Sequence, residues 1–222
     1  MQRMERLVLF FAFINTQLFH MKTNIKSDKK RNAKENGKSQ SPSYLQKFFI
    51  DQLKDMHYAE NELLRGLEEM KNATSTEELE DAFDNHIKQT QRHIQRLEKV
   101  FRMIGKEPES KSCEAMDGLL KECREIISET EEGTMTRDAA LIIAAQKVEH
   151  YEIATYGGLV ALARTMNLER AADLLDKTLA EEADTDTKLT DIAEAYINVE
   201  AEQEGDYVWE KQENGNVTAN AF

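Results

Sequence analysis

Seven ionisable side chains occupy positions at which the sequence otherwise repeats apolar residues with helical spacing. They are Glu60, His86, His93, Glu149, Glu152, Glu182 and Asp186. Residues three or four apart share one face of a helix, so these groups would point into a core with their apolar neighbours. Burying even a neutral polar group without a partner costs roughly 2–7 kcal/mol, and a charge costs more. Carboxylate oxygens and imidazole nitrogens suit divalent iron or manganese, so a buried metal pair would compensate them.

Each of these interruptions lies near the middle of a long apolar stripe, and there are four such stripes. Glu60 interrupts the first stripe, whose apolar members are Phe49, Leu53, Met56, Leu63, Leu67 and Met70. The second stripe covers residues 79–104 and contains His86, Thr90 and His93. The third and fourth stripes, over residues 142–159 and 168–196, contain Glu149, Glu152, Glu182 and Asp186. Because all four interruptions fall at a similar depth, the side chains can converge on one point when the helices pack together.

Taken one at a time, the same residues have ordinary alternatives. Glu60 could turn toward solvent at the edge of its stripe, and a single His86 or His93 is more often a structural histidine. Glu152 could also face solvent, because Glu149 and Glu152 straddle their stripe. The four interruptions together favour a metal site over coincidence. Three residues are predicted as additional ligands or as hydrogen-bonding partners of ligands, namely His93, Gln89 and Tyr156.

Long helices are needed to position these groups. Between residues 44 and 200 the chain has a single proline, Pro108, and abundant Ala, Leu, Glu, Lys and Gln, which favours helix. We therefore predict an all-α domain with helices over residues 43–72, 75–104, 113–131, 137–165 and 168–198. The order is hairpin, crossover segment with an extra short helix, and second hairpin. A crossover of about 30 residues is the connectivity of a ferritin-like four-helix bundle.

Charge separates this bundle from the rest of the chain. We predict that residues 1–43 form a basic, disordered arm, residues 44–200 the bundle and residues 201–222 a polar tail. The whole chain carries −13, and the arm contributes nine Lys or Arg against three Asp or Glu, so the remainder carries −19. Such a surface repels nucleic-acid phosphates and attracts cations. We therefore expect metal ions as ligands and no nucleic acid.

The cysteines and the amino-terminal segment bear on the compartment. Cys113 and Cys123 would lie about 15 Å apart on one helix, too far for a disulfide, which indicates buried thiols in a reducing compartment. The apolar run over residues 7–14 follows Arg3 and Arg6, as in a signal peptide. It is too short to span a bilayer, and no small-residue cleavage pattern follows it. We expect a cytoplasmic protein without a membrane span, and favour an extension or disordered arm over an export signal.

The third and fourth helical segments also carry a family resemblance. The runs Val148-Glu-His-Tyr-Glu152 and Leu179-Ala-Glu-Glu-Ala-Asp-Thr-Asp-Thr-Lys-Leu189 resemble the YciE/YciF-type ferritin-like proteins, as does Tyr58-Ala-Glu60. The resemblance covers residues 45–197. It implies a ferritin-like bundle, a homodimer, a di-iron centre with two ions per chain and a bacterial stress-associated role. Carried over by position, it implies the ligands Glu60, His86, Glu149, Glu152, Glu182 and Asp186.

One departure from the ferritin-like pattern affects the expected number of metal ions. The second and fourth helices of such bundles commonly carry Glu-x-x-His. Here residues 86–89 read His-Ile-Lys-Gln, and the fourth helix has Asp186 in place of the histidine. One strong and one weak metal position is therefore compatible with the sequence, as is a metal other than iron, such as manganese.

Two functions of different classes follow from these observations. The first is a di-metal protein with oxidase-like or peroxidase-like chemistry, in which iron reacts with dioxygen or peroxide. The second is a structural or partner-binding bundle that acts as a dimer in a stress response, with a vestigial or purely structural metal site. The sequence contains no Gly-rich phosphate loop and no nucleophile elbow, which argues against nucleotide and α/β-hydrolase chemistry.

Overall fold

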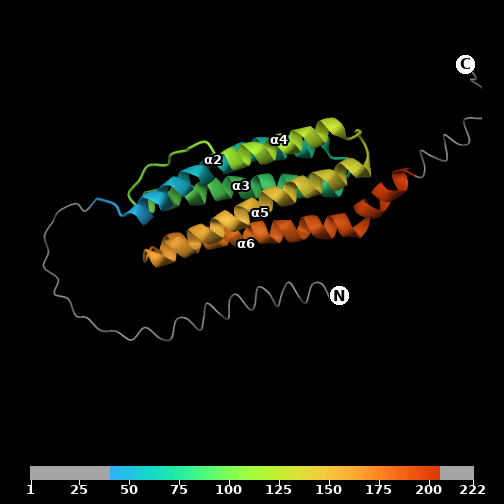
Figure 1. Cartoon of the computed structure of the whole chain (residues 1–222). Coiled ribbons are helices and arrows are strands. Elements are labelled where there is room, and N and C mark those ends of the chain that lie inside the picture. Colours follow the sequence, from blue (N-terminus) through green and yellow to red (C-terminus); the bar gives the residue numbers. More distant parts are fainter. Residues whose placement is uncertain (1–40, 206–222) are drawn as a thin grey trace, which may run out of the picture. The chain divides into compact units, whose positions relative to one another are not determined.

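The computed structural model describes residues 41–205, and within that range the regular structure is entirely helical (Figure 1). The elements are α2 (Tyr44–Ala73), α3 (Glu77–Met103), α4 (Glu114–Glu129), α5 (Met135–Thr165), α6 (Glu169–Ile192) and a short π-helical segment, η2 (Ala193–Ile197). The predicted all-α class and helix order are confirmed. The helix boundaries agree with the prediction to within a few residues, except at the end of the last helix.

Four of the helices form a bundle made of two antiparallel hairpins. α2 pairs with α3 and α5 pairs with α6, while α3 contacts α6 and α2 contacts α5, which closes the ring. The short α4 lies on the outside against α2 and α5 (Figure 1). It belongs to the crossover that joins the hairpins, so the predicted ferritin-like connectivity is confirmed.

The first helix begins with a reciprocal cap. Ser43 accepts a hydrogen bond from the backbone N–H of Gln46 at 3.1 Å, and the Gln46 side chain accepts one from the backbone N–H of Ser43 at 2.7 Å. This capping box satisfies two amides that the helix itself leaves without partners. It fixes the start of α2 and therefore the height of Glu60 along the bundle.

The start of α3 is capped by a residue from a different hairpin. Asp138, in the first turn of α5, is fully buried. Its carboxylate accepts hydrogen bonds from the backbone N–H groups of Ser75 (2.7 Å) and Thr76 (3.0 Å) and from the Thr76 hydroxyl (2.7 Å). A carboxylate at a helix N-terminus is stabilised by the free amides and by the helix dipole. This contact ties the first hairpin to the second.

The core contains the apolar members of all four stripes, and it also holds α4 in place. The largest fully buried side chains include Tyr156, Phe49, Phe83 and Phe101. Leu120 of α4 packs directly against Gly66 of α2, where a Cβ atom would lie 2.4 Å from a Leu120 methyl carbon. The glycine therefore allows the close approach of α4 to α2. Cys113 and Cys123 are buried, and burial raises the pKa of the Cys123 thiol to about 11.

The last helix differs from the prediction. We predicted a helix that ends at Asn198, whereas α6 passes into η2 and the helix then continues to residue 205 (Figure 1). Glu204 accepts hydrogen bonds from the backbone N–H groups of Met135 (2.6 Å) and Thr136 (3.0 Å) at the start of α5. Residues 1–40 of the predicted arm and residues 206–222 of the predicted tail lie outside the described range. Among the described helices, none has the length and apolar character needed to cross a membrane.

Candidate metal centre

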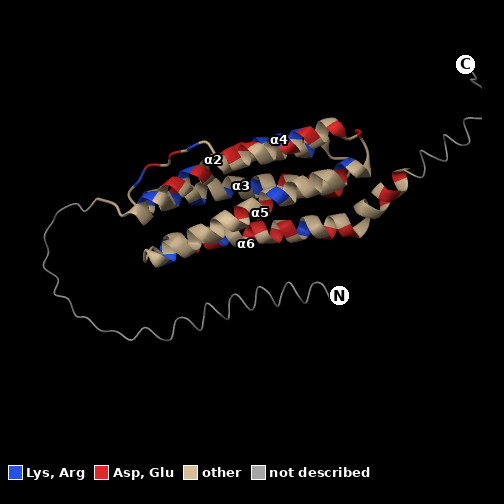
Figure 2. Ribbon diagram, viewed as in Figure 1, with Lys and Arg blue, Asp and Glu red and all other residues tan. Residues whose placement is uncertain are grey.

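Six of the predicted polar side chains meet halfway along the bundle. α2 contributes Glu60, α3 contributes His86 and His93, α5 contributes Glu149 and Glu152, and α6 contributes Glu182. Each side chain is at most 2% exposed. Acidic residues are also visible at the middle of α5 and α6 (Figure 2).

The ligand atoms fall into two overlapping groups. One group consists of His86, Glu149, Glu152 and Glu182, and the other of Glu60, His93 and Glu182. Within each group, one nitrogen or oxygen atom per residue lies within 4.8 Å of the others. Glu182 belongs to both groups, and its two oxygens face different histidines. Each group could hold a cation, and Glu182 would then be shared between the two positions.

The histidines lie between carboxylates. His86 Nδ1 is 3.1 Å from Glu149 Oε1, and His86 Nε2 is 3.4 Å from Glu182 Oε2. His93 Nδ1 is 2.8 Å from Glu182 Oε1 and 3.6 Å from Glu60 Oε1. These distances are those of ion pairs. However, His86 Nε2, His93 Nδ1 and both Glu182 oxygens have no aligned hydrogen-bond partner.

Unpartnered polar atoms concentrate at this point of the molecule. In the described part of the chain, eleven buried side-chain nitrogen or oxygen atoms lack a hydrogen-bond partner, and eight of them belong to this cluster. The three exceptions are on Asp55, His57 and Thr90. Native proteins leave few such atoms because each costs about 1–3 kcal/mol. Four carboxylates with two neutral histidines would be neutralised by two divalent cations, so the donor set fits a metal pair.

Burial controls the protonation of the α5 carboxyls. Burial raises the pKa of Glu149 to about 7, although the neighbouring His86 opposes the rise. Burial also raises the pKa of Glu152 well above its usual range, and the charges of Glu60 and Glu182 act in the same direction. Neither Glu152 oxygen has a hydrogen-bond partner. Without a cation, the protonated form of Glu152 is therefore favoured relative to that of an exposed glutamate.

The opposite shift occurs around the histidines. Burial lowers the pKa of His93, but Glu182 and Glu60 outweigh this effect and raise the pKa to about 10. Burial would raise the pKa of Glu182, yet the adjacent His86 and His93 bring it down to about 2. Without a metal, the histidines therefore act as the cations that stabilise the Glu182 carboxylate.

Two residues outside the predicted set hold His93 in place. Glu181 Oε2 accepts a hydrogen bond from His93 Nε2 at 2.9 Å. Arg96 donates two hydrogen bonds, of 2.9 and 2.6 Å, to the two oxygens of the same carboxylate. Because Nε2 donates its proton to Glu181, Nδ1 is the ring nitrogen that faces Glu60 and Glu182, where a bound cation would replace its proton. The stripe pattern did not identify Glu181 or Arg96, since both lie on the flanks of their helices.

The remaining predicted residues have three different placements. The Tyr156 hydroxyl donates a hydrogen bond to Glu60 Oε1, consistent with a partner of a ligand. Gln89 is half-buried outside the cluster, where its Oε1 accepts a hydrogen bond from the Thr185 hydroxyl at 3.4 Å. Asp186 is not brought into either group. Its side chain is 23% exposed and lies 3.1 Å from Gln146 Nε2 and 3.3 Å from His150 Nε2.

Comparison with known proteins gives consistent matches across the bundle. A family model described as a domain of unknown function, DUF892, matches residues 44–202. Protein YciF of Escherichia coli K12 is 46% identical over 160 residues, which are 69% of this chain and 93% of that protein. The crystal structure of the E. coli stress protein YciF matches with a TM-score of 0.67 and 44% identity, covering 71% of this chain and 99% of that one.

Two further solved structures extend the comparison. YcfI of Rhodopseudomonas palustris, provisionally called a structural protein, matches with a TM-score of 0.65 and 34% identity over 68% of this chain and 96% of that one. A protein of Xanthomonas campestris matches with a TM-score of 0.57 and 18% identity, which shows the fold alone.

Proposed function

We propose that this chain, which belongs to the YciF-like DUF892 family, binds two divalent metal ions through its buried ligand set. The family agrees with the resemblance of the sequence to YciE/YciF-type proteins. Iron is the leading candidate for the metal. The observation that carries this proposal is the sharing of Glu182 between two groups of unpartnered ligand atoms. His86, Glu149 and Glu152 would hold one ion, and Glu60 and His93 the other. Glu182 would bridge them.

The proposed chemistry is redox chemistry of iron with a small oxidant. Bound iron would supply electrons to dioxygen or peroxide, an oxidase-like or peroxidase-like reaction. The chain would exclude bulk water by burying every ligand, and Tyr156 would hold a proton next to Glu60, because burial raises the pKa of its hydroxyl. Since YciF is called a stress protein, removal of iron and oxidant together is a protective role that fits this site.

The test is a titration of metal-free protein with Fe(II) in the absence of oxygen. Binding should saturate near two ions per chain, and Glu182→Gln should lower the affinity of both positions because it removes the shared oxygen. Glu169→Gln, at an exposed acid in the first turn of the same helix, is the matched control and should bind as the parent does. Absence of binding by the parent chain, or unchanged binding by Glu182→Gln, would contradict the proposal.

A second candidate rests on a separate observation, namely that both histidines already lie between carboxylates. A self-compensated network of this kind could serve a structural or partner-binding dimer with no functional metal. In that case a chelator should leave the thermal midpoint unchanged. If the protein binds metal, the thermal midpoint should rise with metal concentration. At a free metal concentration of a hundred times Kd, the free energy of unfolding should increase by about 2.7 kcal/mol. Sedimentation of the full chain would test the proposed homodimer.

A further inference from the structure

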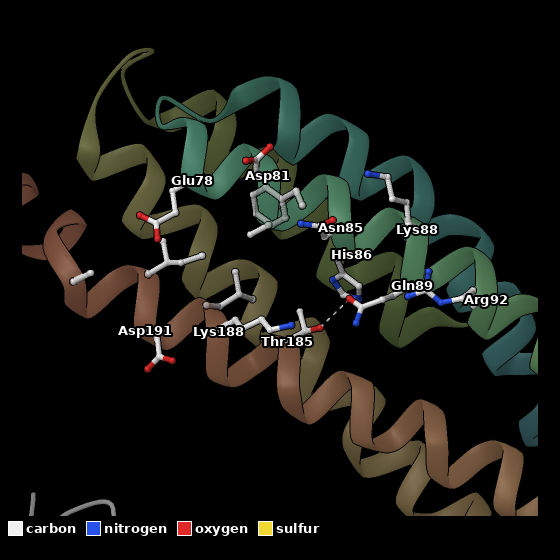
Figure 3. A pocket seen from close by; sticks show the side chains of 15 residues that line it. Glu78, Asp81, Asn85, His86, Lys88, Gln89, Arg92, Thr185, Lys188 and Asp191 are labelled. Atoms are coloured by element: carbon white, nitrogen blue, oxygen red, sulfur yellow. Dashed lines mark hydrogen bonds between the residues drawn. The ribbon is translucent and has the colours of Figure 1, made fainter.

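A groove between α3 and α6 leads from the surface to His86 (Figure 3). Its volume is about 750 Å³. Small-molecule sites commonly have volumes of roughly 300–1,000 Å³, so the groove has the size of a ligand pocket. It is lined by α3 on one side and by α6 with η2 on the other.

The groove exists because the facing side chains are too short to fill the space between the two helices. Ala82 and Asn85 face it from α3, while Thr185 faces it from α6. The π-helical segment after α6 contributes Ala195 at the end of the groove. Single π-helical turns are rare and occur often at functional sites. Here the turn contributes another small side chain to the wall.

The lining changes character along the groove. Its apolar floor is formed by Phe83, Leu189 and Ile192, which are at most 9% exposed. Toward the other end lie cationic side chains, and Lys188 extends toward Thr185 near the middle (Figure 3). Within residues 41–205, neither Lys188 nor Arg92 has a carboxylate within 4.0 Å, whereas Lys88 pairs with Asp84 at 2.5 Å. Two cations therefore remain available to a ligand.

Polar groups at the middle of the groove add hydrogen-bond donors to these cations. Gln89 turns its Oε1 toward the Thr185 hydroxyl, which donates mainly to the Glu181 carbonyl, so the Gln89 amide N–H groups are free to donate. His86 lies deeper, is 2% exposed and has an unpartnered Nε2. At the apolar end, the rim carries Glu78, Asp81 and Asp191 (Figure 3). A second negative charge on the ligand would be repelled there.

We propose that this groove binds a small apolar molecule that carries one carboxylate. The carboxylate would lie between Lys188 and Arg92 and accept from Gln89, next to the His86 edge of the cluster. The apolar body would cover Phe83, Leu189 and Ile192. Charge-assisted hydrogen bonds would orient the head, and the floor would supply most of the affinity by burial of apolar surface. The site is formed by the chain alone, so it does not depend on bound metal.

Three straight-chain probes of similar apolar length test the proposal on metal-free, full-length protein. Octanoate, octan-1-ol and octylammonium carry an anionic, a neutral and a cationic head group, respectively. Titrations followed by amide chemical shifts should show octanoate binding at least about tenfold more tightly than either of the others. The shifts of Gln89 and Thr185 should follow octanoate. Equal binding of octylammonium, or octanoate shifts elsewhere in the chain, would overturn the assignment.

Variants at exposed positions separate the two halves of the site. Lys188→Gln should weaken octanoate about tenfold and leave octan-1-ol unchanged, because only the charged contact is lost. Ala195→Phe should weaken both probes by filling the apolar end. Lys99→Gln, an exposed lysine of α3 outside the groove, is the control and should bind as the parent does. Octanoate binding that survives both groove variants would contradict the proposal. Because no metal is present, the outcome is independent of the iron titration.

Discussion

Glu181 is positioned to act on the proposed metal centre through His93. Its hydrogen bond holds Nε2 of the ring, and Arg96 prevents the carboxylate from turning toward solvent. His86 has no equivalent partner, since its two ring nitrogens face Glu149 and Glu182, which are themselves proposed ligands. The two proposed metal positions should therefore differ in how firmly the histidine ligand is oriented. Hydrogen bonds from outside the ligand set hold His93, whereas His86 has no such contact within the described residues.

Glu181→Gln tests this difference. Loss of such a histidine partner typically lowers metal affinity 10–100-fold, so we expect a weakening of about this size at the His93 position and little change at the His86 position. A two-site fit of the Fe(II) titration would resolve the two effects. Asp184→Asn, at an exposed acid of the same helix, provides the control. Equal weakening at both positions would show that Glu181 acts on the whole site.

The placement of Asp186 yields a second prediction. Because its side chain faces Gln146 and His150, Asp186→Asn should retain two ions per chain with an affinity within about threefold of the parent. Glu182→Gln should not retain them. Metal analysis of the two purified variants side by side gives the answer, and loss of an ion from Asp186→Asn would restore the ligand role that the sequence and the resemblance predicted.

Glu181 and Asp186 show where sequence reasoning loses precision. Both lie one position beside the buried row of Glu182, Thr185 and Leu189, on opposite flanks of α6. The stripe pattern included Asp186 and left out Glu181, whereas the contacts with the neighbouring helices place Glu181 beside His93. On one flank α3 presents His93 and Arg96, whereas on the other α5 presents Gln146 and His150. Residues at the centre of a stripe could be predicted from the sequence, but residues on its flanks could not.

At the scale of elements, helix order and the crossover were predictable because apolar stripes and turn residues are local signals. Two features were not predictable from local signals. The cap of α3 by Asp138 connects residues more than 60 positions apart, and nothing near Thr76 indicates it. The π-helical turn at Ala193–Ile197 inserts into a run with normal helix propensity. The cap depends on packing between the hairpins, whereas η2 packs against α5 within the second hairpin and α4 packs against α2 from the crossover.

That close contact can be measured with a pair of glycine substitutions. Gly66→Ala places a methyl group against the buried Leu120 side chain, whereas the neighbourhood of Gly118 in α4 is open. An exposed helical glycine gains about 0.5–1 kcal/mol on replacement by alanine, while overpacking costs about 1–3 kcal/mol. Urea unfolding should therefore find Gly118→Ala more stable than the parent and Gly66→Ala less stable than Gly118→Ala by at least about 1 kcal/mol. Equal stability would mean that Leu120 moves aside freely.

At the scale of the whole molecule, the buried carboxyls make stability depend on pH. The pKa of Glu149 rises from 4.5 to about 7 on folding, so its stabilising proton is lost as pH rises through this window. His93, with a pKa raised from 6.5 to about 10, loses its contribution as pH rises through that higher window. Glu182 acts oppositely, but only below pH 4.5.

Metal-free protein should therefore unfold at lower denaturant concentration at pH 8 than at pH 5. A pKa difference of one unit corresponds to about 1.4 kcal/mol, so the change should reach the kcal/mol range. Metal-loaded protein should show the reverse dependence, because its ligands must be deprotonated. Urea unfolding with and without chelator provides both measurements. A Glu149→Gln variant should reduce the pH dependence of the stability of the metal-free protein. An unchanged pH dependence in that variant would show that groups other than Glu149 cause it.

The buried cap at Asp138 has a consequence for dividing the chain. Cut within the crossover, the first fragment would begin α3 with open amides, and the second would carry a carboxylate that has lost its three donors. The ligands are divided in the same way, with both histidines and Glu60 in one piece and the other glutamates in its complement. Each fragment therefore lacks a hydrogen-bonding partner and part of the ligand set, and the other fragment contains both. The two halves are therefore complementary pieces that should assemble from separate polypeptides, with metal promoting their association.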